Sequence, residues 1–209
     1  MRRALDVICS GAGLVLLSPL FALIALAIKL DDGGPVFFTH RRVGHDLRPF
    51  GLFKFRSMIQ GADRFAQLTV QEDKRLTRVG RLLRKAKLDE LPQLANVLRG
   101  DMRFVGPRPE VERYVRMFPS EYAQLLRDRP GITDPASLMY RQEENLLCGN
   151  NVEDLYISRI LPHKLRISLA YQDRRNVFKD LTVVVKTLFS RQSSVSYSEA
   201  IGKEDSATS

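Results

Sequence analysis

The chain has 209 residues, enough for one domain with appendages, and it carries a net charge of +9. Its two cysteines, Cys9 and Cys148, lie far apart, which argues against a disulfide framework and against a cysteine metal site, and indicates a reducing compartment. The positive charge is local: residues 41–87 hold 13 Lys and Arg against 4 Asp and Glu, which supplies the whole net charge. Such a block favours an anionic partner, namely nucleic acid, anionic lipid or a phosphorylated substrate, and the alternative is a solvated basic face.

An uncharged apolar segment of 22 residues, Val7–Ile28, lies near the N-terminus. At about 1.5 Å per residue, such a helix approaches the roughly 30 Å thickness of a bilayer core. Three interpretations are open: a spanning helix, a cleaved signal, or a helix that enters the membrane and returns. The leading Arg2-Arg3 and the stretch Ala25-Leu26-Ala27, which imitates a small-residue cleavage site, are typical of a signal, whereas Asp6 and the length of the run argue against one.

The flanking charges favour a re-entrant helix. Basic residues stand on both sides of the segment, and positive charge prefers the cytoplasmic face, so both ends favour the same side. Pro19 provides the bend, because it has no N–H for the carbonyl of Val15. Ser18 is expected to bond back to the carbonyl of Leu14 and so to help the lipid-embedded kink. We therefore predict a re-entrant membrane helix kinked at Ser18-Pro19; a kinked spanning helix and a signal remain alternatives.

The rest of the chain predicts short strands followed by helices. The stretches "VFFTHRRV" (36–43) and "FGLFKFR" (50–56) are aromatic and β-branched and predict a β-hairpin. Residues 76–88 have one apolar and one basic face at helical spacing, which is typical of an interfacial helix or of a surface helix packed on the core. A further helix is expected from Asp89, with Pro92 in its first turn and Gly100 at its end.

The second half of the chain is expected to be helical after a stiff loop. In "GPRPE" (106–110) the two prolines fix the backbone and display Arg108 and Glu110. Helices are then predicted at Glu112–Arg127 and at 178–189, where apolar residues recur at helical spacing. The expected fold class is mainly α with a small β-hairpin, α+β, with interfacial amphipathic helices besides the re-entrant one.

Two adjacent acids, Asp89 and Glu90, are the chemical centre of the basic block. Carboxylates at a helix start are commonly caps stabilised by the helix dipole, and that is the plain alternative. Their surroundings favour chemistry instead, since the cationic Arg84, Lys85 and Lys87 precede them. Ionised carboxylates among cations suit Mg²⁺ bound against phosphates, and a carboxylate can also attack phosphorus.

Four stretches of the chain resemble the bacterial sugar transferase family, the monotopic phosphoglycosyltransferases that start glycan assembly on a lipid carrier. They are "KFRSM" (54–58), "DKRLTRVGRLLRKAKLDELPQLANVLRGDM" (73–102), "FVGPRPE" (104–110) and "RPGITDPAS" (129–137). The resemblance runs from about Arg2 to about Phe189 and is to the minimal, catalytic form. It implies transfer of a phosphosugar from a UDP-sugar to polyprenol (undecaprenyl) phosphate, giving polyprenyl-diphosphate-sugar and UMP. The products of such pathways are exopolysaccharide, O-antigen or glycoprotein glycans.

The resemblance also implies roles for residues. Asp89 would be the nucleophile, forming a covalent aspartyl phosphosugar, and would hold Mg²⁺. Glu90 would assist as the dyad partner, by positioning or as a base. The residues implied to contact phosphate or uridine are Arg84, Arg108, Lys54 and Arg56, with Asp101 a further candidate beside them. For Arg56 the alternative is an ion pair that holds the hairpin to the core.

The resemblance sets the expected organisation and location. We expect a membrane anchor at 1–30, a catalytic domain at 31–189 packed on the membrane interface, and a disordered Ser-rich tail at 190–209. The enzyme would lie in the bacterial inner membrane, facing the cytoplasm and bound to the lipid bilayer, with later glycosyltransferases of the pathway as further partners. His40 stands where the family usually has Gln, and Arg103 where it usually has a small polar residue. A membrane-tethered nucleic-acid-binding protein and a scaffold for glycan enzymes are the competing hypotheses; no nucleic-acid motif supports the first.

Overall fold

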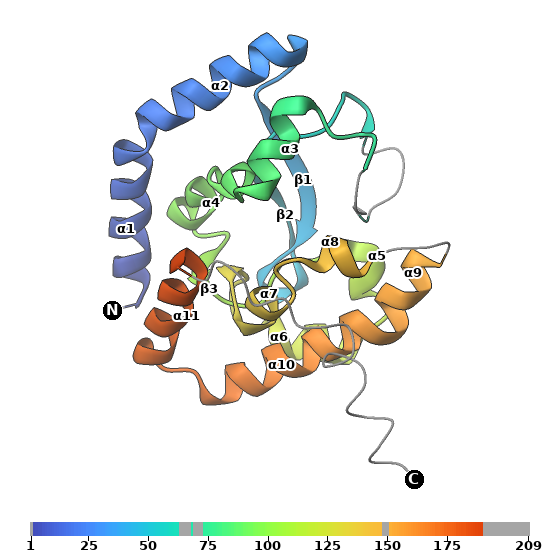
Figure 1. Ribbon diagram of the computed structural model, residues 1–209. Coiled ribbons are helices and arrows are strands. Elements are labelled where there is room, and N and C mark those ends of the chain that lie inside the picture. Colours follow the sequence, from blue (N-terminus) through green and yellow to red (C-terminus); the bar gives the residue numbers. More distant parts are fainter. Residues whose placement is uncertain (1, 63–67, 69–72, 148–150, 190–209) are drawn as a thin grey trace. The chain divides into compact units, whose positions relative to one another are not determined.

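The computed structural model describes residues 2–62, 68, 73–147 and 151–189 (Figure 1). Helices predominate, and the described strands pair in two small two-stranded sheets, so the predicted α+β class is confirmed. The chain divides into two compact units, residues 1–67 with 73–132, and residues 68–72 with 133–209. The predicted boundary between a membrane anchor, 1–30, and a catalytic domain, 31–189, concerns contact with a membrane, whereas the two units are defined by compactness. That boundary stays a prediction. The predicted tail, 190–209, lies outside the described residues.

The N-terminal apolar segment forms two helices, α1 (Arg2–Leu16) and α2 (Ser18–Asp32), which meet at a bend of 58° (Figure 1). Within the described residues no one helix is long and apolar enough to cross a bilayer, whereas this bent pair meets the length and composition criteria when taken together. Ser18 Oγ donates to the Val15 carbonyl at 2.8 Å, and not to Leu14 as expected from sequence. The reason is the break itself, because Pro19 leaves the Val15 carbonyl without its helical donor and Ser18 supplies the substitute.

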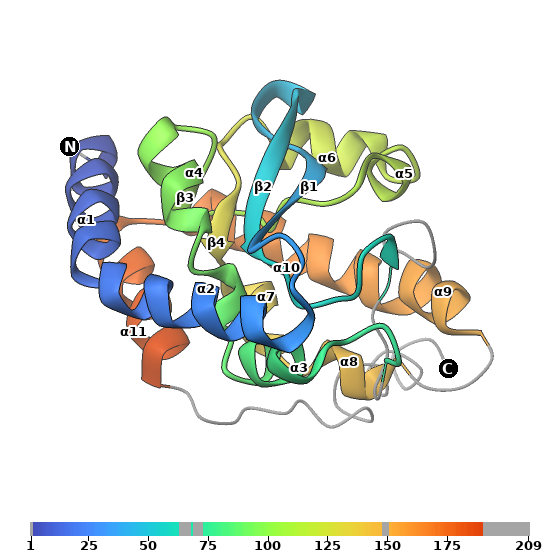
Figure 2. The ribbon, with the colours of Figure 1, turned by 90° about the horizontal axis from the view of Figure 1, so that it is seen from above.

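Both ends of this helix pair are fastened to the first unit. Near the N-terminus, Arg3 donates to the carbonyls of Val97 at 2.5 Å and Leu98 at 2.9 Å, at the end of helix α4. Near the C-terminus of α2, Asp31 accepts the backbone N–H of Val79 at 3.0 Å. Seen from above, α2 lies alongside α3 (Figure 2), and Ile24 and Ile28 of α2 bury their side chains in the same cluster as Phe55 and Leu83.

The predicted hairpin is present as β1 (Phe37–Val43) and β2 (Pro49–Phe55), paired antiparallel from Phe37–Phe55 to Val43–Pro49. A tight 3₁₀ turn, His45–Leu47, joins the strands. Leu52 of β2 packs with Val97 of α4 and with Met102 in a second apolar cluster. The hairpin is thereby fixed to the helix that follows the two acids.

The helices around the acids are shorter than predicted. Helix α3 covers Arg78–Lys85, capped by Thr77 Oγ1, which accepts the Gly80 N–H at 2.9 Å. A 3₁₀ turn, Leu88–Glu90, precedes α4 (Gln93–Arg99), so the acids lie just before α4 and not in its first turn. The predicted end of α4 is confirmed: Gly100 has a φ of 97°, a left-handed conformation that favours glycine.

Two short strands, β3 (Arg103–Val105) and β4 (Gly131–Thr133), form the second sheet. Between them the single helix predicted at Glu112–Arg127 is wrong, because the chain forms α5 (Glu112–Val115) and α6 (Pro119–Leu125). Pro119 is the cause, since it disfavours helical geometry at Phe118, whose φ and ψ are −131° and 60°.

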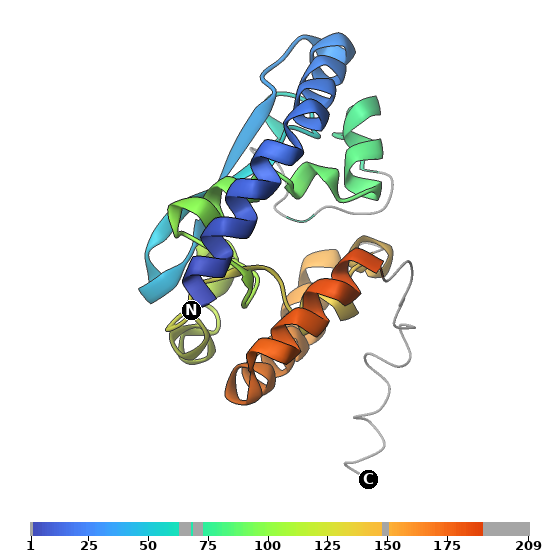
Figure 3. The same cartoon turned by 90° about the vertical axis from the view of Figure 1, so that its left-hand side faces the viewer.

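The second unit is helical in its described part. Its elements are α7 (Pro135–Met139), α8 (Glu143–Leu146), α9 (Val152–Leu155), a π-helical segment (Tyr156–Ile160), α10 (Leu161–Arg174) and α11 (Val177–Phe189). Where α11 follows α10 (Figure 3), Asp180 accepts from Tyr171 at 2.7 Å and from Arg175 at 3.1 Å. The helix expected at 178–189 is confirmed, but Phe178, Leu188 and Phe189 are 81%, 72% and 78% exposed, so much of its apolar surface is uncovered.

Candidate active site

The acidic pair lies in the turn between α3 and α4. Lys87, two residues after the end of α3, has a left-handed conformation with a φ of 57° and redirects the chain into the Leu88–Glu90 turn. Pro92 then begins α4 with a helical φ of −61°. A non-glycine residue held in the left-handed region costs of the order of 1 kcal/mol, and such positions gather at functional sites.

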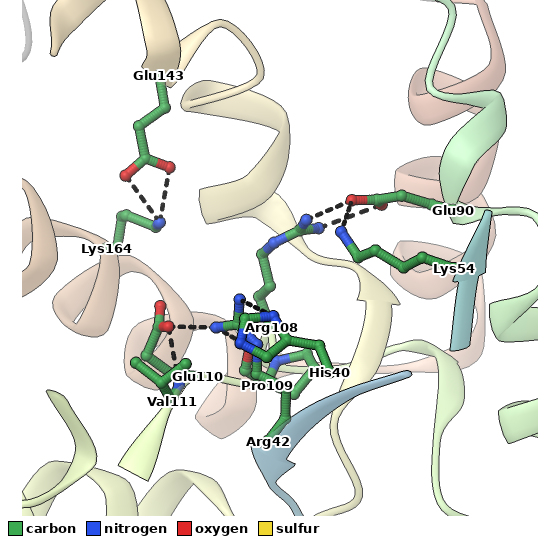
Figure 4. Close-up of polar contacts among 10 residues, drawn as sticks. All are labelled: His40, Arg42, Lys54, Glu90, Arg108, Pro109, Glu110, Val111, Glu143 and Lys164. Atoms are coloured by element: carbon green, nitrogen blue, oxygen red, sulfur yellow. Dashed lines mark hydrogen bonds and ion pairs between the residues drawn. The ribbon is translucent and has the colours of Figure 1, made fainter. Parts of the chain in front are cut away.

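Glu90 is held by two cations that come from distant parts of the chain (Figure 4). Lys54 of β2 donates from Nζ to Glu90 Oε1 at 3.1 Å. Arg108 donates from Nη2 to Oε1 at 2.5 Å and from Nη1 to Oε2 at 3.4 Å. Burial by itself would raise the pKa of Glu90, but Arg108 first and Lys54 next outweigh it and hold that pKa well below its ordinary value. Glu90 is therefore a fixed anion.

The pKa of Asp89 is shifted in the opposite direction, upward. Its side chain is 5% exposed, and its buried Oδ1 has no hydrogen-bond partner. Burial raises the pKa of Asp89, and the negative charge of Glu90 adds to the rise, while Lys54, Arg84 and Lys87 oppose it. A buried acceptor without a partner costs about 1–3 kcal/mol, so its retention calls for a functional reason.

The structure separates the other predicted site residues. Arg84 stands in the last turn of α3, and its positive charge acts on Asp89. Arg56, 6% exposed, pairs with Asp32 of α2 and donates to the Pro35 carbonyl at 2.6 Å, which matches the ion-pair interpretation left open from the sequence. Asp101 accepts from Asn96 Nδ2 at 3.2 Å. Lys54, Glu90 and Arg108 are thus brought together, whereas Arg56 and Asp101 make other contacts.

A magnesium ion fits the donor set only with help from a ligand. Within residues 2–62, 73–147 and 151–189, no three His, Cys, Asp or Glu side chains are grouped as a metal site. Mg²⁺ commonly takes one or two carboxylates together with substrate phosphates. The free Oδ1 of Asp89 is a suitable oxygen ligand of that kind, while the oxygens of Glu90 are already taken by cations.

One positioning residue, Asn96, was not predicted from the sequence. Asn96 of α4 is fully buried, accepts the Phe53 N–H at 2.9 Å and donates to the Gly51 carbonyl at 2.7 Å. It therefore locks the strand that carries Lys54 to the helix that follows Glu90. The sequence did place this polar residue between the predicted buried positions Leu94 and Val97. That pattern indicates a buried polar side chain but does not identify the groups to which it hydrogen-bonds.

The arrangement defines a class of site: two acids whose pKa values are shifted in opposite directions, surrounded by cations, beside a bent pair of apolar helices. It is suited to binding and attacking a phosphate group. The model of the bacterial sugar transferase family matches residues 1–193. The chain belongs to the bacterial sugar transferase family, as the sequence motifs predicted, and is a transferase.

Individual proteins of known name are similar to this chain over most of its length. The exopolysaccharide production protein ExoY of Rhizobium meliloti (strain 1021) is 36% identical over 203 residues, covering 90% of this chain and 83% of the relative. The UDP-glucose:undecaprenyl-phosphate glucose-1-phosphate transferase of Caulobacter vibrioides is 39% identical over 192 residues, covering 90% of this chain and 68% of the relative. The Escherichia coli (strain K12) protein of the same name is 36% identical over 195 residues, covering 90% of this chain and 39% of the relative.

Proposed function

We propose that this chain transfers a sugar 1-phosphate from a UDP-sugar to polyprenol phosphate, giving polyprenyl-diphosphate-sugar and UMP, as the first step of a glycan such as exopolysaccharide. The names of the relatives support the reaction class. The observation that carries the proposal is the pairing of a buried carboxylate that has a free oxygen, Asp89, with a carboxylate fixed by Lys54 and Arg108. A carboxylate oxygen without a hydrogen-bond partner keeps its lone pairs available for attack on phosphorus.

The proposed chemistry has two steps. An oxygen of Asp89 attacks the β-phosphorus of the donor; the Asp89–phosphorus bond forms, the bond from that phosphorus to the bridging oxygen breaks, and UMP leaves with that oxygen. A phosphate oxygen of the polyprenol phosphate then attacks the same phosphorus and releases Asp89. The raised pKa of Asp89 makes its carboxylate more basic than an ordinary aspartate, and so a better nucleophile once it is ionised.

The surrounding residues have separate tasks in this proposal. Lys54, Arg84 and Arg108 neutralise the phosphate charge and position the diphosphate. Glu90 orients those cations as the dyad partner, since its lowered pKa keeps it ionised. Asp89 and the donor diphosphate would hold Mg²⁺, which would supply charge neutralisation at the reacting phosphate when bound.

We also propose that α1 and α2 form the re-entrant anchor of a protein on the cytoplasmic face of the bacterial inner membrane. The 58° bend, the Ser18 bond to Val15, and the attachment of both ends to the same unit support it, because a spanning pair would place its ends on opposite faces. The exposed apolar face of α11 fits an interfacial helix. Later glycosyltransferases of the pathway are expected partners.

The topology has its own test. Single cysteines placed near Met1 and at Gly33, in a chain with Cys9 and Cys148 replaced, are labelled with an impermeant thiol reagent in sealed vesicles of known orientation. A re-entrant anchor predicts labelling of both from the same face. Labelling from opposite faces would establish a spanning anchor and refute the proposal.

The reaction is tested by UMP release from purified protein with Mg²⁺, undecaprenyl phosphate and a panel of UDP-sugars. Release that depends on the lipid phosphate is expected for at least one donor, and donor alone should leave a phosphosugar on Asp89, detected by mass spectrometry. Absence of release across the panel, together with steeply salt-dependent binding of DNA or RNA, would favour the nucleic-acid alternative. Part of the basic block at 41–87 is paired with carboxylates within the protein, which reduces the positive charge left for a nucleic acid. The paired residues are Arg42, Lys54, Arg56 and Arg75.

A further inference from the structure

Another ion pair of the first unit, between the half-buried side chains of Arg42 and Glu110, takes no part in the proposed chemistry. Arg42 of β1 donates from Nη1 to Glu110 Oε1, and the two side chains are only 17% and 12% exposed (Figure 4). The same Nη1 lies 3.5 Å from the Pro109 carbonyl oxygen. His40 Nδ1 lies 3.3 Å from Arg42 Nη2, so His40, which stands where the family usually has Gln, contacts this pair.

The pair fastens one end of the loop that carries Arg108. Val43 of β1 donates its N–H to the Glu110 carbonyl at 2.9 Å, and the Val111 N–H donates to Glu110 Oε1 at 2.9 Å. Side chain and backbone of Glu110 are therefore both held, the first by Arg42 and the second by the strand.

The other end of the loop is fastened by β4. Gly131 donates its N–H to the Pro107 carbonyl at 3.0 Å. A Cβ on Gly131 would lie 2.1 Å from the Gly106 nitrogen, so the two backbones are in direct contact. Between these two attachments, Pro107 and Pro109 restrict the backbone on either side of Arg108.

We propose that Arg42 and Glu110 are a positioning pair that places Arg108 on Glu90, a role that rests on the proposed function. The Arg108 side chain is 37% exposed and long, so its two-nitrogen contact with Glu90 needs a backbone set in advance. A displacement of about 1 Å at such a group costs on the order of 10²-fold in rate. The planar guanidinium of Arg42 contacts three groups at once: the Glu110 carboxylate, the Pro109 carbonyl and the His40 ring nitrogen. The single ammonium group of a lysine would not reproduce this geometry.

The test is a double-mutant cycle on UMP release, normalised to folded protein. Arg108→Met is expected to lower kcat/KM by about 10²-fold, and Arg42→Met by about 10-fold because it only loosens the loop. The double variant should be no worse than Arg108→Met alone, since a loosened loop no longer matters once Arg108 is gone. A merely structural role predicts the same loss in both backgrounds, and that additive result would overturn the proposal.

Two further variants keep the test decisive if Arg42→Met folds poorly. Glu110→Gln keeps a hydrogen-bond acceptor for Arg42 and should lower kcat/KM only with Arg108 present. The exchange of charges, Arg42→Glu with Glu110→Arg, should recover part of the loss seen in Arg42→Met. The matched control is Glu112→Gln, which breaks the exposed pair with Arg116 and should change nothing. Glu110→Gln losing the same factor in both backgrounds, or a charge exchange without recovery, would count against positioning.

A readout independent of activity separates this proposal from the proposed function. Hydrogen exchange of the peptide 106–111 should rise about 10-fold in Arg42→Met and stay unchanged in Glu112→Gln. If the wild type releases no UMP from any donor, the proposed function fails while the exchange result still decides whether the pair holds the loop. Unchanged exchange in Arg42→Met would overturn the positioning role whatever the activity.

Discussion

Asp89→Asn is expected to abolish transfer while making the protein more stable. The wild type holds a carboxylate that is 95% buried with one oxygen unpartnered. An unpartnered buried polar group costs about 1–3 kcal/mol and a charged one costs more, so the ionised carboxylate is costlier to bury than the neutral amide that replaces it. The attraction of Asp89 to Lys54, Arg84 and Lys87 offsets part of that cost. We therefore take the lower end, a gain of about 1 kcal/mol for the neutral amide, which corresponds to about 2–4 °C in Tm for a chain of this size.

The pH dependence of this gain has a definite sign. Burial raises the folded-state pKa of Asp89 above its ordinary 3.8. The stability that this carboxyl contributes is therefore present below pH 3.8 and is lost as the pH rises through the folded-state pKa. The Tm advantage of Asp89→Asn should be largest near neutral pH and should narrow as the pH falls toward 3.8.

The assay compares UMP release and thermal unfolding without Mg²⁺ for the wild type, Asp89→Asn and a control, Asp134→Asn. Asp134 in the second unit is also buried, but both its oxygens accept, from the Ser137 N–H at 2.7 Å and the Ser168 hydroxyl at 2.5 Å. The control should therefore lose about 1 kcal/mol, since charge-assisted bonds are replaced by neutral ones. A fall in the Tm of Asp89→Asn similar to that of the control would contradict the expected cost of burying the Asp89 carboxylate. Retained UMP release would refute the assignment of Asp89 as the nucleophile.

Three other substitutions test the neighbouring contacts. Lys54→Met should lower kcat for UMP release by about 10²-fold, whereas Lys54→Arg should retain part of it, because a cation still reaches Glu90; equal loss in both would argue against a charge role. Asp32→Asn should lower stability by about 1 kcal/mol at pH 7 by weakening the pair with Arg56. The hydrogen bond from Arg56 lowers the pKa of Asp32, so the deficit of the variant should hold above pH 3.8 and shrink below it; a deficit independent of pH would contradict this. Ser18→Ala should cost about 1 kcal/mol in lipid by leaving the Val15 carbonyl unpaired, measured as chemical denaturation in bilayers against Ser10→Ala as control; equal costs would refute a special role for the kink.

The local features of the fold were predictable from the sequence. Aromatic and β-branched residues predicted the hairpin of β1 and β2, and Gly100 predicted the end of α4. The position of Pro19 specified where the apolar segment bends. The family was predictable because its motifs are long and contiguous in the sequence, and the acids at 89–90 lie within one of them. The helix break at Pro119 was not predicted, although its signal is local. A proline disfavours helical geometry at the residue before it, and that residue is Phe118.

Which charged side chains pair with one another depends on the tertiary structure. Lys54 and Glu90 are 36 residues apart and Arg108 and Glu90 are 18 apart, so no periodicity links them. Arg56 carries the same charge and lies two residues from Lys54, yet it is buried against Asp32 instead. Ion pairs between distant segments depend on how strands and helices pack, and burial then separates the two adjacent acids into one fixed anion and one carboxylate with a raised pKa.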